Sequence, residues 1–213
     1  MNWSLNEVEA LARKAARGRG MSWGLAEETG KATRVLCEWG VDAPAALALL
    51  LQQHDGMAHE AVAPLQSTGP WQAYGGALCP IAAGCRISDL AEDLRAGPIE
   101  MRAVAHPVLL LGFAQMAARR LGQPVYLTLD TAQVCATADG IGVAGDLAAP
   151  PDTADVSAAL SGEGFGTALA HHGRAEITDD TAAILTAFAQ RTYAPATEAS
   201  RLAGAGAGLS DND

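Results

Sequence analysis

Residues 4–40 read SLNEVEALARKAARGRGMSWGLAEETGKATRVLCEWG, and this stretch decides how the fold begins. Ser4 and Glu7 have the spacing of a capping box, in which each side chain satisfies a free backbone N–H at the start of a helix. Two glycines end the first helix, and Ser22 caps a second one. The sequence therefore predicts two packed antiparallel helices, over residues 5–17 and 23–39.

Beyond the hairpin, the spacing of the apolar residues changes from helical to alternating. Over residues 54–76 the apolar residues have no regular spacing, and we expect this stretch to be a long loop. Further helices are predicted over residues 45–53, 88–94, 107–121 and 179–191. Strands are predicted over residues 99–103, 125–129, 133–137, 141–143, 156–160 and 174–177. This order predicts an α+β fold, with the N-terminal helical hairpin and further helices packed on a small antiparallel sheet.

The length of 213 residues suffices for one domain with a sizeable core. Apolar residues make up 49% of the chain and charged residues 18%, which is typical of a globular protein rather than a disordered one. We expect a single domain over residues 1–213. Its parts are a helical region over about 1–98, an α+β region over about 99–195, and a glycine-rich tail over 196–213.

The charge and the apolar runs exclude two classes of partner. A net charge of −10 opposes binding to nucleic acid, which requires a basic surface. The longest apolar runs are too short to span a bilayer, so we expect no membrane association. The N-terminus does not have the basic and then apolar pattern of an export signal. We therefore expect a cytoplasmic protein with four reduced cysteines, of which Cys37 and Cys135 are buried and inert.

Cys79 and Cys85 are candidate catalytic residues, because they flank a turn marked by proline and glycine (Cys79-Pro-Ile-Ala-Ala-Gly-Cys85). Such a pair suits a nucleophile with a resolving thiol, or two metal ligands. The spacing fits structural zinc poorly, and we predict no metal site. A catalytic cysteine requires a lowered pKa, which the neighbouring Arg86 favours. The other interpretation is that both cysteines are small buried apolar residues.

Glu27 and Glu28 are the candidate general bases. They lie early in the second predicted helix, where the helix dipole stabilises carboxylates, and this structural role also explains them. Neighbouring helix positions point about 100° apart, so we expect only one of the two to face the first helix.

The histidines carry weaker signals. His54 and His59 are separated by a glycine and lack the spacing of a zinc-binding helix. His106 precedes a proline, and we interpret it as a residue at the N-terminus of a helix. His171 and His172 are either solvated loop residues or the source of one ligand or general base.

The C-terminal tail holds the candidate ligand-binding residues Ser200, Arg201, Gly204, Gly206 and Gly208. Alternate glycines allow backbone N–H groups to converge on an anion, and the arginine adds a bidentate donor. We predict an anion- or carboxylate-binding concavity close to the glutamates of the second helix. The other interpretation is a solvated terminal segment.

Three segments resemble a bacterial family of uncharacterised proteins, a domain-of-unknown-function family. They are Ser4 to Gly18 followed by Trp23-Gly-Leu-Ala-Glu-Glu28, then Ala77 to Cys85, and finally Thr192-Tyr-Ala-Pro195 through Asp211. The resemblance covers most of the chain. It implies no activity, cofactor or partner, but it points to the same glutamates, cysteines and tail.

Two functional hypotheses stay open. The first is a cytoplasmic small-molecule enzyme, or a subunit of one, that acts on an anionic metabolite. Arg201 would hold the carboxylate of the substrate, and Glu27 or Glu28 would act as general base. The second is a non-catalytic binding or assembly protein that docks through its alanine-rich helices and its tail. The cofactor is unknown. A small anionic molecule, a second copy of the chain or a partner subunit are the compatible partners.

Overall fold

The computed structural model describes residues 1–66, 69–147 and 151–193, and it has the expected α+β architecture. Its helices are α1 (Leu5–Arg19), α2 (Trp23–Glu38), α3 (Ala43–Gln53), α4 (His59–Val62), α5 (Pro80–Asp89), α6 (Leu110–Leu121) and α7 (Asp179–Gln190), with 3-10 helices η1 (Ala91–Arg95) and η2 (Pro107–Leu109). Its strands are β1 (Asn2–Ser4), β2 (Ile99–Ala105), β3 (Val125–Thr128), β4 (Ala132–Ala136), β5 (Ile141–Gly145), β6 (Thr153–Ala159), β7 (Thr167–Ala168) and β8 (Arg174–Glu176).

The predicted helical hairpin is confirmed. The backbone N–H of Ser4 donates to Glu7 Oε2 at 2.8 Å, and the Ser4 hydroxyl accepts from the Glu7 N–H at 3.3 Å, which completes the capping box. Gly20 ends α1 in the left-handed conformation, with φ 104°. Ser22 then caps α2 by accepting from the Leu25 N–H at 3.3 Å. The short connection brings α1 and α2 together along their length.

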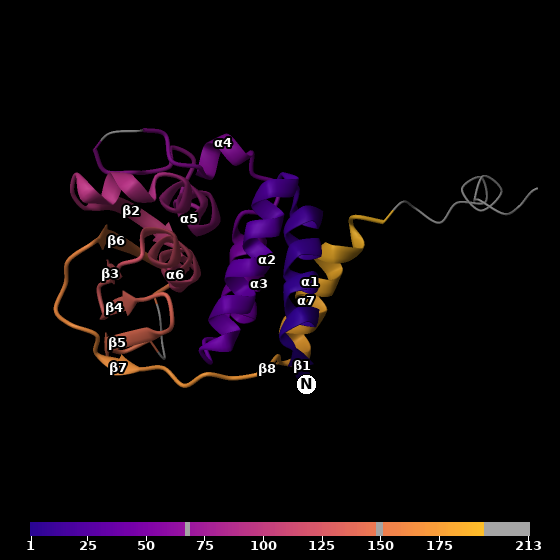
Figure 1. Cartoon of the computed structure of the whole chain (residues 1–213). Coiled ribbons are helices and arrows are strands. Elements are labelled where there is room, and N and C mark those ends of the chain that lie inside the picture. Colours follow the sequence, from indigo (N-terminus) through magenta and orange to yellow (C-terminus); the bar gives the residue numbers. More distant parts are fainter. Residues whose placement is uncertain (67–68, 148–150, 194–213) are drawn as a thin grey trace, which may run out of the picture.

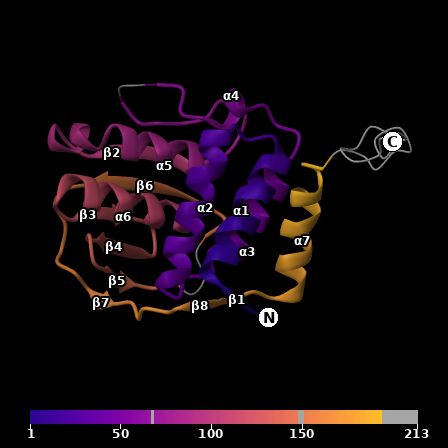
Figure 2. The ribbon, with the colours of Figure 1, turned by 45° about the vertical axis from the view of Figure 1, so that its right-hand side comes forward.

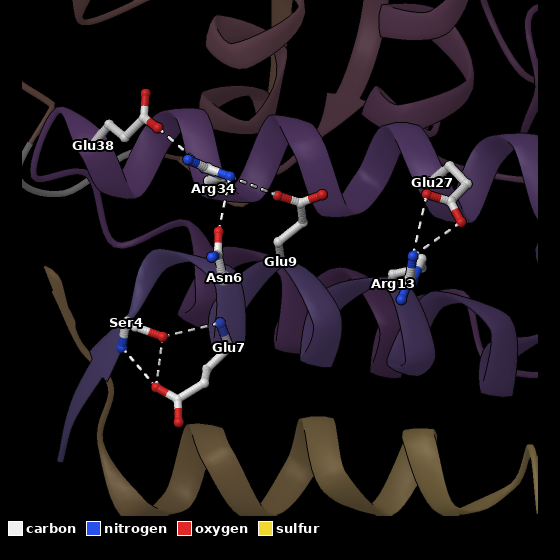
Figure 3. A network of polar contacts seen from close by, with 8 residues as sticks. All are labelled: Ser4, Asn6, Glu7, Glu9, Arg13, Glu27, Arg34 and Glu38. Carbon is white, nitrogen blue, oxygen red and sulfur yellow. Dashed lines mark hydrogen bonds and ion pairs between the residues drawn. The ribbon is translucent and has the colours of Figure 1, made fainter. Parts of the chain in front are cut away.

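Ion pairs join the outer faces of α1 and α2 (Figure 3). Arg13 pairs with Glu27 at 3.2 Å, and Arg34 pairs with Glu9 at 3.2 Å; Arg34 also pairs with Glu38 at 3.1 Å within α2. These side chains are partly exposed, so each pair contributes about 0–1 kcal/mol. Each helix contributes an arginine and a glutamate to the pairs between α1 and α2. The pairs therefore determine the register of the hairpin but add little to its stability.

A six-stranded antiparallel sheet forms within the described residues, in the order β2-β6-β3-β4-β5-β7. Figures 1 and 2 show α6 between this sheet and α2, while α1 and α7 lie on the far side of α2. The buried core is continuous from the helices to the inner face of the sheet. No helix in the described ranges is long and apolar enough to cross a membrane.

A small second sheet closes the helical side of the molecule. The strand predicted near residue 174 is present as β8, and it pairs antiparallel with β1. The terminal amino group of Met1 donates to the carbonyl of Ile177 at 2.6 Å. Thr178 then caps α7, which packs on α1 and α3. The start of the chain is thus joined to the segment that leads into α7.

The prediction of a turn between Cys79 and Cys85 is wrong, because these residues begin helix α5. Pro80 occupies the first helical turn, where its missing N–H costs nothing and its fixed φ favours the helix. Gly84 is required for packing: a Cβ there would overlap the ring of Phe113 on α6. The proline and glycine therefore serve a helix and its contact with another helix.

The helix predicted over residues 88–94 is also wrong in its boundaries. Ser88 lies in the last turn of α5, and a 3-10 helix follows over Ala91–Arg95. Within residues 54–76 the chain forms the short helix α4, and Trp71 bridges to Met101 of β2. This segment therefore packs along an edge of the sheet.

His54 is a buried histidine at the end of α3. It is 2% exposed, and neither ring nitrogen has a hydrogen-bond partner in the described part of the chain. Burial lowers its pKa from 6.5 to about 4; the charge of Arg19 and the proximity of His106 act in the same direction, and the carbonyl of Ala77 opposes them. His54 is therefore neutral in the folded protein near neutral pH.

Acidification should destabilise the protein through His54. Between pH 6.5 and pH 4 the unfolded chain binds a proton on this residue that the folded chain does not. The penalty is absent above this window and reaches at most about 3 kcal/mol below it. The substitution His54→Leu removes it, so the wild type should lose stability relative to the variant as the pH falls. Urea unfolding at about pH 7.5, 5.5 and 4.5 measures this difference.

His59→Gln is the matched control, because His59 is exposed. It should lose stability on acidification as the wild type does. A difference between wild type and His54→Leu that is the same at all three pH values would contradict the prediction.

Candidate functional site

The structure brings three of the sequence candidates together. Glu27 and Glu28 on α2 and Cys85 on α5 line one pocket of about 350 Å³. Asp89 contributes a further carboxylate at the end of α5. Cys79 does not line this pocket; it is the N-cap residue of α5 and is 3% exposed.

The chemistry of this pocket disfavours a nucleophilic thiol. Burial, followed by the charges of Glu28 and Asp89, raises the pKa of Cys85 to about 12. Burial also raises the pKa of Cys79. Glu28 is paired with Lys31 at 2.7 Å, and Glu27 with the arginine of α1 already described. Carboxylates line the pocket, so it repels an anionic ligand. The catalytic roles expected for these residues stay predictions.

The ligand-binding candidates of the tail, Ser200, Arg201, Gly204, Gly206 and Gly208, lie outside the described residues. The concavity expected from them therefore stays a prediction too.

A second pocket, of about 280 Å³, lies between α3 and the junction of β2 with η2. It is lined by Val41, Asp42, Ala45, Ala46, Leu49, His106, Val108, Leu147 and Asp152. Most of these side chains are apolar, and a few polar groups converge among them. Such a composition is typical of small-molecule sites.

His106 is the unusual residue of this pocket. It has φ 42° and ψ 59°, the left-handed conformation that costs a non-glycine residue roughly 1–3 kcal/mol. Its backbone N–H donates to the carbonyl of Asp152 at 2.8 Å, which helps to hold this conformation. The residue is 8% exposed, and no hydrogen bond to its imidazole ring is present among the described residues. Strained backbone held by its surroundings is concentrated at functional sites.

Two opposing effects set the pKa of His106. Burial lowers it, and the carboxylate of Asp152 raises it in part, with a net lowering. The imidazole is therefore neutral near pH 7 and able to accept a proton. A histidine with a pKa below its usual value, in a pocket and beside a carboxylate, has the properties of a general acid–base group.

The sequence did not reveal this site. His106 was expected at the start of a helix, and it is the residue before the 3-10 helix η2. The signal that could have identified it is its position between the end of a strand and Pro107. A residue before proline is disfavoured in the right-handed helical region, so it does not simply begin a helix.

A third and larger pocket, of about 640 Å³, adjoins the second through Val41 and Asp42, which line both. Its walls are the α2–α3 turn and the segment of His172 to Glu176, with Asn2 beside it. Asp42 is the N-cap residue of α3, and its Oδ1 accepts from the backbone N–H of Ala45 at 3.2 Å. The N-cap residue of α3 is therefore common to the two pockets.

Arg174 is a lining residue of this larger pocket, and Asn2 holds its guanidinium through two hydrogen bonds. Its Nε donates to Asn2 Oδ1 at 2.7 Å, and its Nη2 donates to the Asn2 carbonyl at 3.0 Å. His172 packs on Gly40 so closely that a Cβ there would lie 2.9 Å from Nε2. His171 meets Trp39 edge to face, with ring centroids 5.3 Å apart. These two histidines fasten the segment to the end of α2.

Within residues 1–66, 69–147 and 151–193, no group of three His, Cys, Asp or Glu side chains is placed to hold a metal ion.

Comparison with known proteins gives a family for part of the chain. Residues 3–79 match a family described as a protein of unknown function (DUF3726). The expected resemblance to a domain-of-unknown-function family is thus confirmed over α1 to α4 and up to the start of α5. The similarity of the later segments stays a prediction. No curated protein matches the chain.

Among solved structures, a crystal structure of malate dehydrogenase from Entamoeba histolytica is similar at a TM-score of 0.48 and 14% sequence identity. The alignment covers 72% of this chain and 49% of that one. This chain thus spans about half the length of that enzyme. At this level the likeness gives no information on function.

The burial of the thiols predicts how the native protein reacts with a thiol reagent. The four cysteines are free; Cys37, Cys79 and Cys135 are buried, and Cys85 is partly exposed. Burial, then the charges of Asp42 and Glu38, also raises the pKa of Cys37 to about 12. A chromogenic disulfide reagent should therefore label at most one thiol, slowly, and all four after denaturation.

The substitution Cys85→Ser should abolish the slow native reaction, whereas Cys135→Ser should leave it unchanged. Rapid labelling of two or more thiols in the native protein would show that these side chains are more accessible than the structure indicates.

Proposed function

We propose that the protein is a small-molecule enzyme in which His106 transfers a proton to or from a substrate bound beside α3. The observation that carries this proposal is the conformation of His106: a nearly buried imidazole, held with positive φ and lining a pocket. For a histidine with only a structural role, this conformation costs free energy without a benefit. For a catalytic histidine, it orients the imidazole ring toward the substrate.

The substrate of this proposed enzyme carries an anionic group. Arg174 supports this, because it lines the adjoining pocket and its contacts to Asn2 use only part of its N–H donors. Arginine suits carboxylates because its donors form a planar fork. The cation first expected for this role, Arg201, stays a second candidate.

The proposal is tested by metabolite consumption. Purified protein is incubated with a pool of small metabolites and coenzymes extracted from cells, and losses and gains are followed by mass spectrometry. The wild type should convert at least one metabolite, and His106→Gln should reduce the rate by at least about 100-fold while it keeps the same thermal unfolding. His59→Gln, an exposed histidine outside the pocket, is the control and should keep the wild-type rate.

The pH dependence gives a second criterion. If His106 is the general base, the rate should fall on acidification with an inflection below 6.5, because its pKa is lowered from that value. Conversion that survives His106→Gln would overturn the proposal. An absence of conversion by the wild type would favour the binding or assembly protein instead.

A further inference from the structure

We propose that the substrate is a zwitterionic amino acid with a compact apolar side chain, bound across the two adjoining pockets. Its carboxylate would lie on Arg174, its ammonium group on Asp42, and its side chain in the pocket of His106. This inference rests on the proposed function, since it names the substrate class of the same site.

The larger pocket is lined by charged residues of both signs. One wall is β8, where Arg174 and Glu176 are two residues apart and lie on the same side of the strand, with the buried Ala175 between them. The other wall is the α2–α3 turn with Asp42. A ligand with a single negative charge meets two carboxylates and one guanidinium here. A ligand that carries both charges satisfies the two walls together.

Arg174 is prepared for a carboxylate. The side chain and the carbonyl of Asn2 accept from Nε and from Nη2, which leaves Nη1 and the second N–H of Nη2 for a ligand. Arg174 is itself exposed, so solvent and a ligand can reach its side chain.

Asp42 occupies the position that an ammonium group requires. It lines both pockets, so a group bound to it lies between the carboxylate end and the His106 end. One carboxylate oxygen is used by the helix cap, and the other is not needed for it. An amino acid has its ammonium group in this same relation, on the carbon that joins the carboxylate to the side chain.

The side-chain end of the site is small and apolar. Val41, Ala45, Ala46, Leu49, Val108 and Leu147 line the pocket of His106. Leu49 is 49% exposed although it is a leucine, which leaves an apolar surface for a ligand to cover. A second carboxylate at this end would meet Asp152 as well as Asp42. The lining therefore favours an aliphatic side chain over an acidic one.

Calorimetric titration of the full chain tests the assignment of each group. The probes are leucine, 4-methylpentanoate (which lacks the ammonium group), isoamylamine (which lacks the carboxylate) and glutamate. We expect leucine to bind at least about tenfold more tightly than each of the others, because the acid and the amine each lose one charged contact and glutamate brings a second carboxylate toward Asp152.

Two substitutions assign the charges to residues. Asp42→Asn keeps a good helix cap but removes the charge. It should therefore weaken the binding of leucine at least about tenfold and leave the affinity for 4-methylpentanoate unchanged. Arg174→Gln should weaken the binding of leucine and leave the affinity for isoamylamine unchanged. Arg120→Gln and Asp89→Asn, which lie outside both pockets, are matched controls and should not change leucine binding.

The results separate this inference from the proposed function. Glutamate binding as tightly as leucine, leucine binding that Asp42→Asn does not weaken, or no leucine binding would overturn the inference. Conversion of another metabolite that depends on His106 would still support the proposed function. If leucine binds as expected but the conversion rate is unchanged by His106→Gln, the proposed function is overturned and the inferred binding site is still supported.

Discussion

The structure depends on how closely α2 is approached from two sides. On one side Gly30 meets α1, where an added Cβ would lie 2.9 Å from the carbonyl oxygen of Glu9. On the other, Gly112 of α6 meets α2, where an added Cβ would lie 2.8 Å from the carbonyl oxygen of Ala32. Backbones this close leave no room for side chains between them. The core therefore packs small residues at these crossings and reserves its large ones for the spaces between layers.

This central helix also determines where the proposed site lies. Helix α6 packs on α2 and also on β3 and β4, so it fixes the position of the sheet relative to α2. The turn after α2, with Gly40 at φ 69°, then directs α3 back along the bundle and places Asp42 at its start. On the sheet side, β2 ends directly at His106, and η2 packs on α3. Two segments distant in the sequence thus meet at one pocket because both neighbour the same helix.

The fold was predictable from the sequence wherever local signals agreed. The capping box at Ser4 and Glu7, the break at Gly20 and the alternation from Val125 onward each determine structure within a few residues. The partner of the strand at residue 174 was not predictable, because β1 lies 172 positions earlier at Asn2. The role of Gly84 in α5 was misinterpreted for a similar reason. It leaves room for the ring of Phe113, which is distant in the sequence, and the residues next to Gly84 in the sequence do not indicate this contact.

The candidate site was harder to predict, because its residues meet only in space. The sequence singled out Glu27, Glu28 and Cys85 as separate candidates, which line one pocket because helices α2 and α5 are neighbours. It gave no way to know that the thiol there is fully protonated, which depends on burial. His106 was overlooked because its signal is a backbone conformation.

The contrast between the buried ionisable groups shows why His106 is the better candidate. For Cys85, burial and the nearby carboxylates favour the protonated thiol, and the opposing charge of Lys31 is the smallest of the effects. For His54, burial, Arg19 and His106 favour the neutral ring against the weaker effect of Ala77, and His54 does not line the pocket of His106. For His106, burial favours the neutral ring and Asp152 favours the charged one. A group whose two states are both supported by its surroundings can change between them during a reaction. Cys85 and His106 both line a pocket in the described part of the chain, but the carboxylate beside His106 supports the charged ring, whereas those beside Cys85 oppose the thiolate.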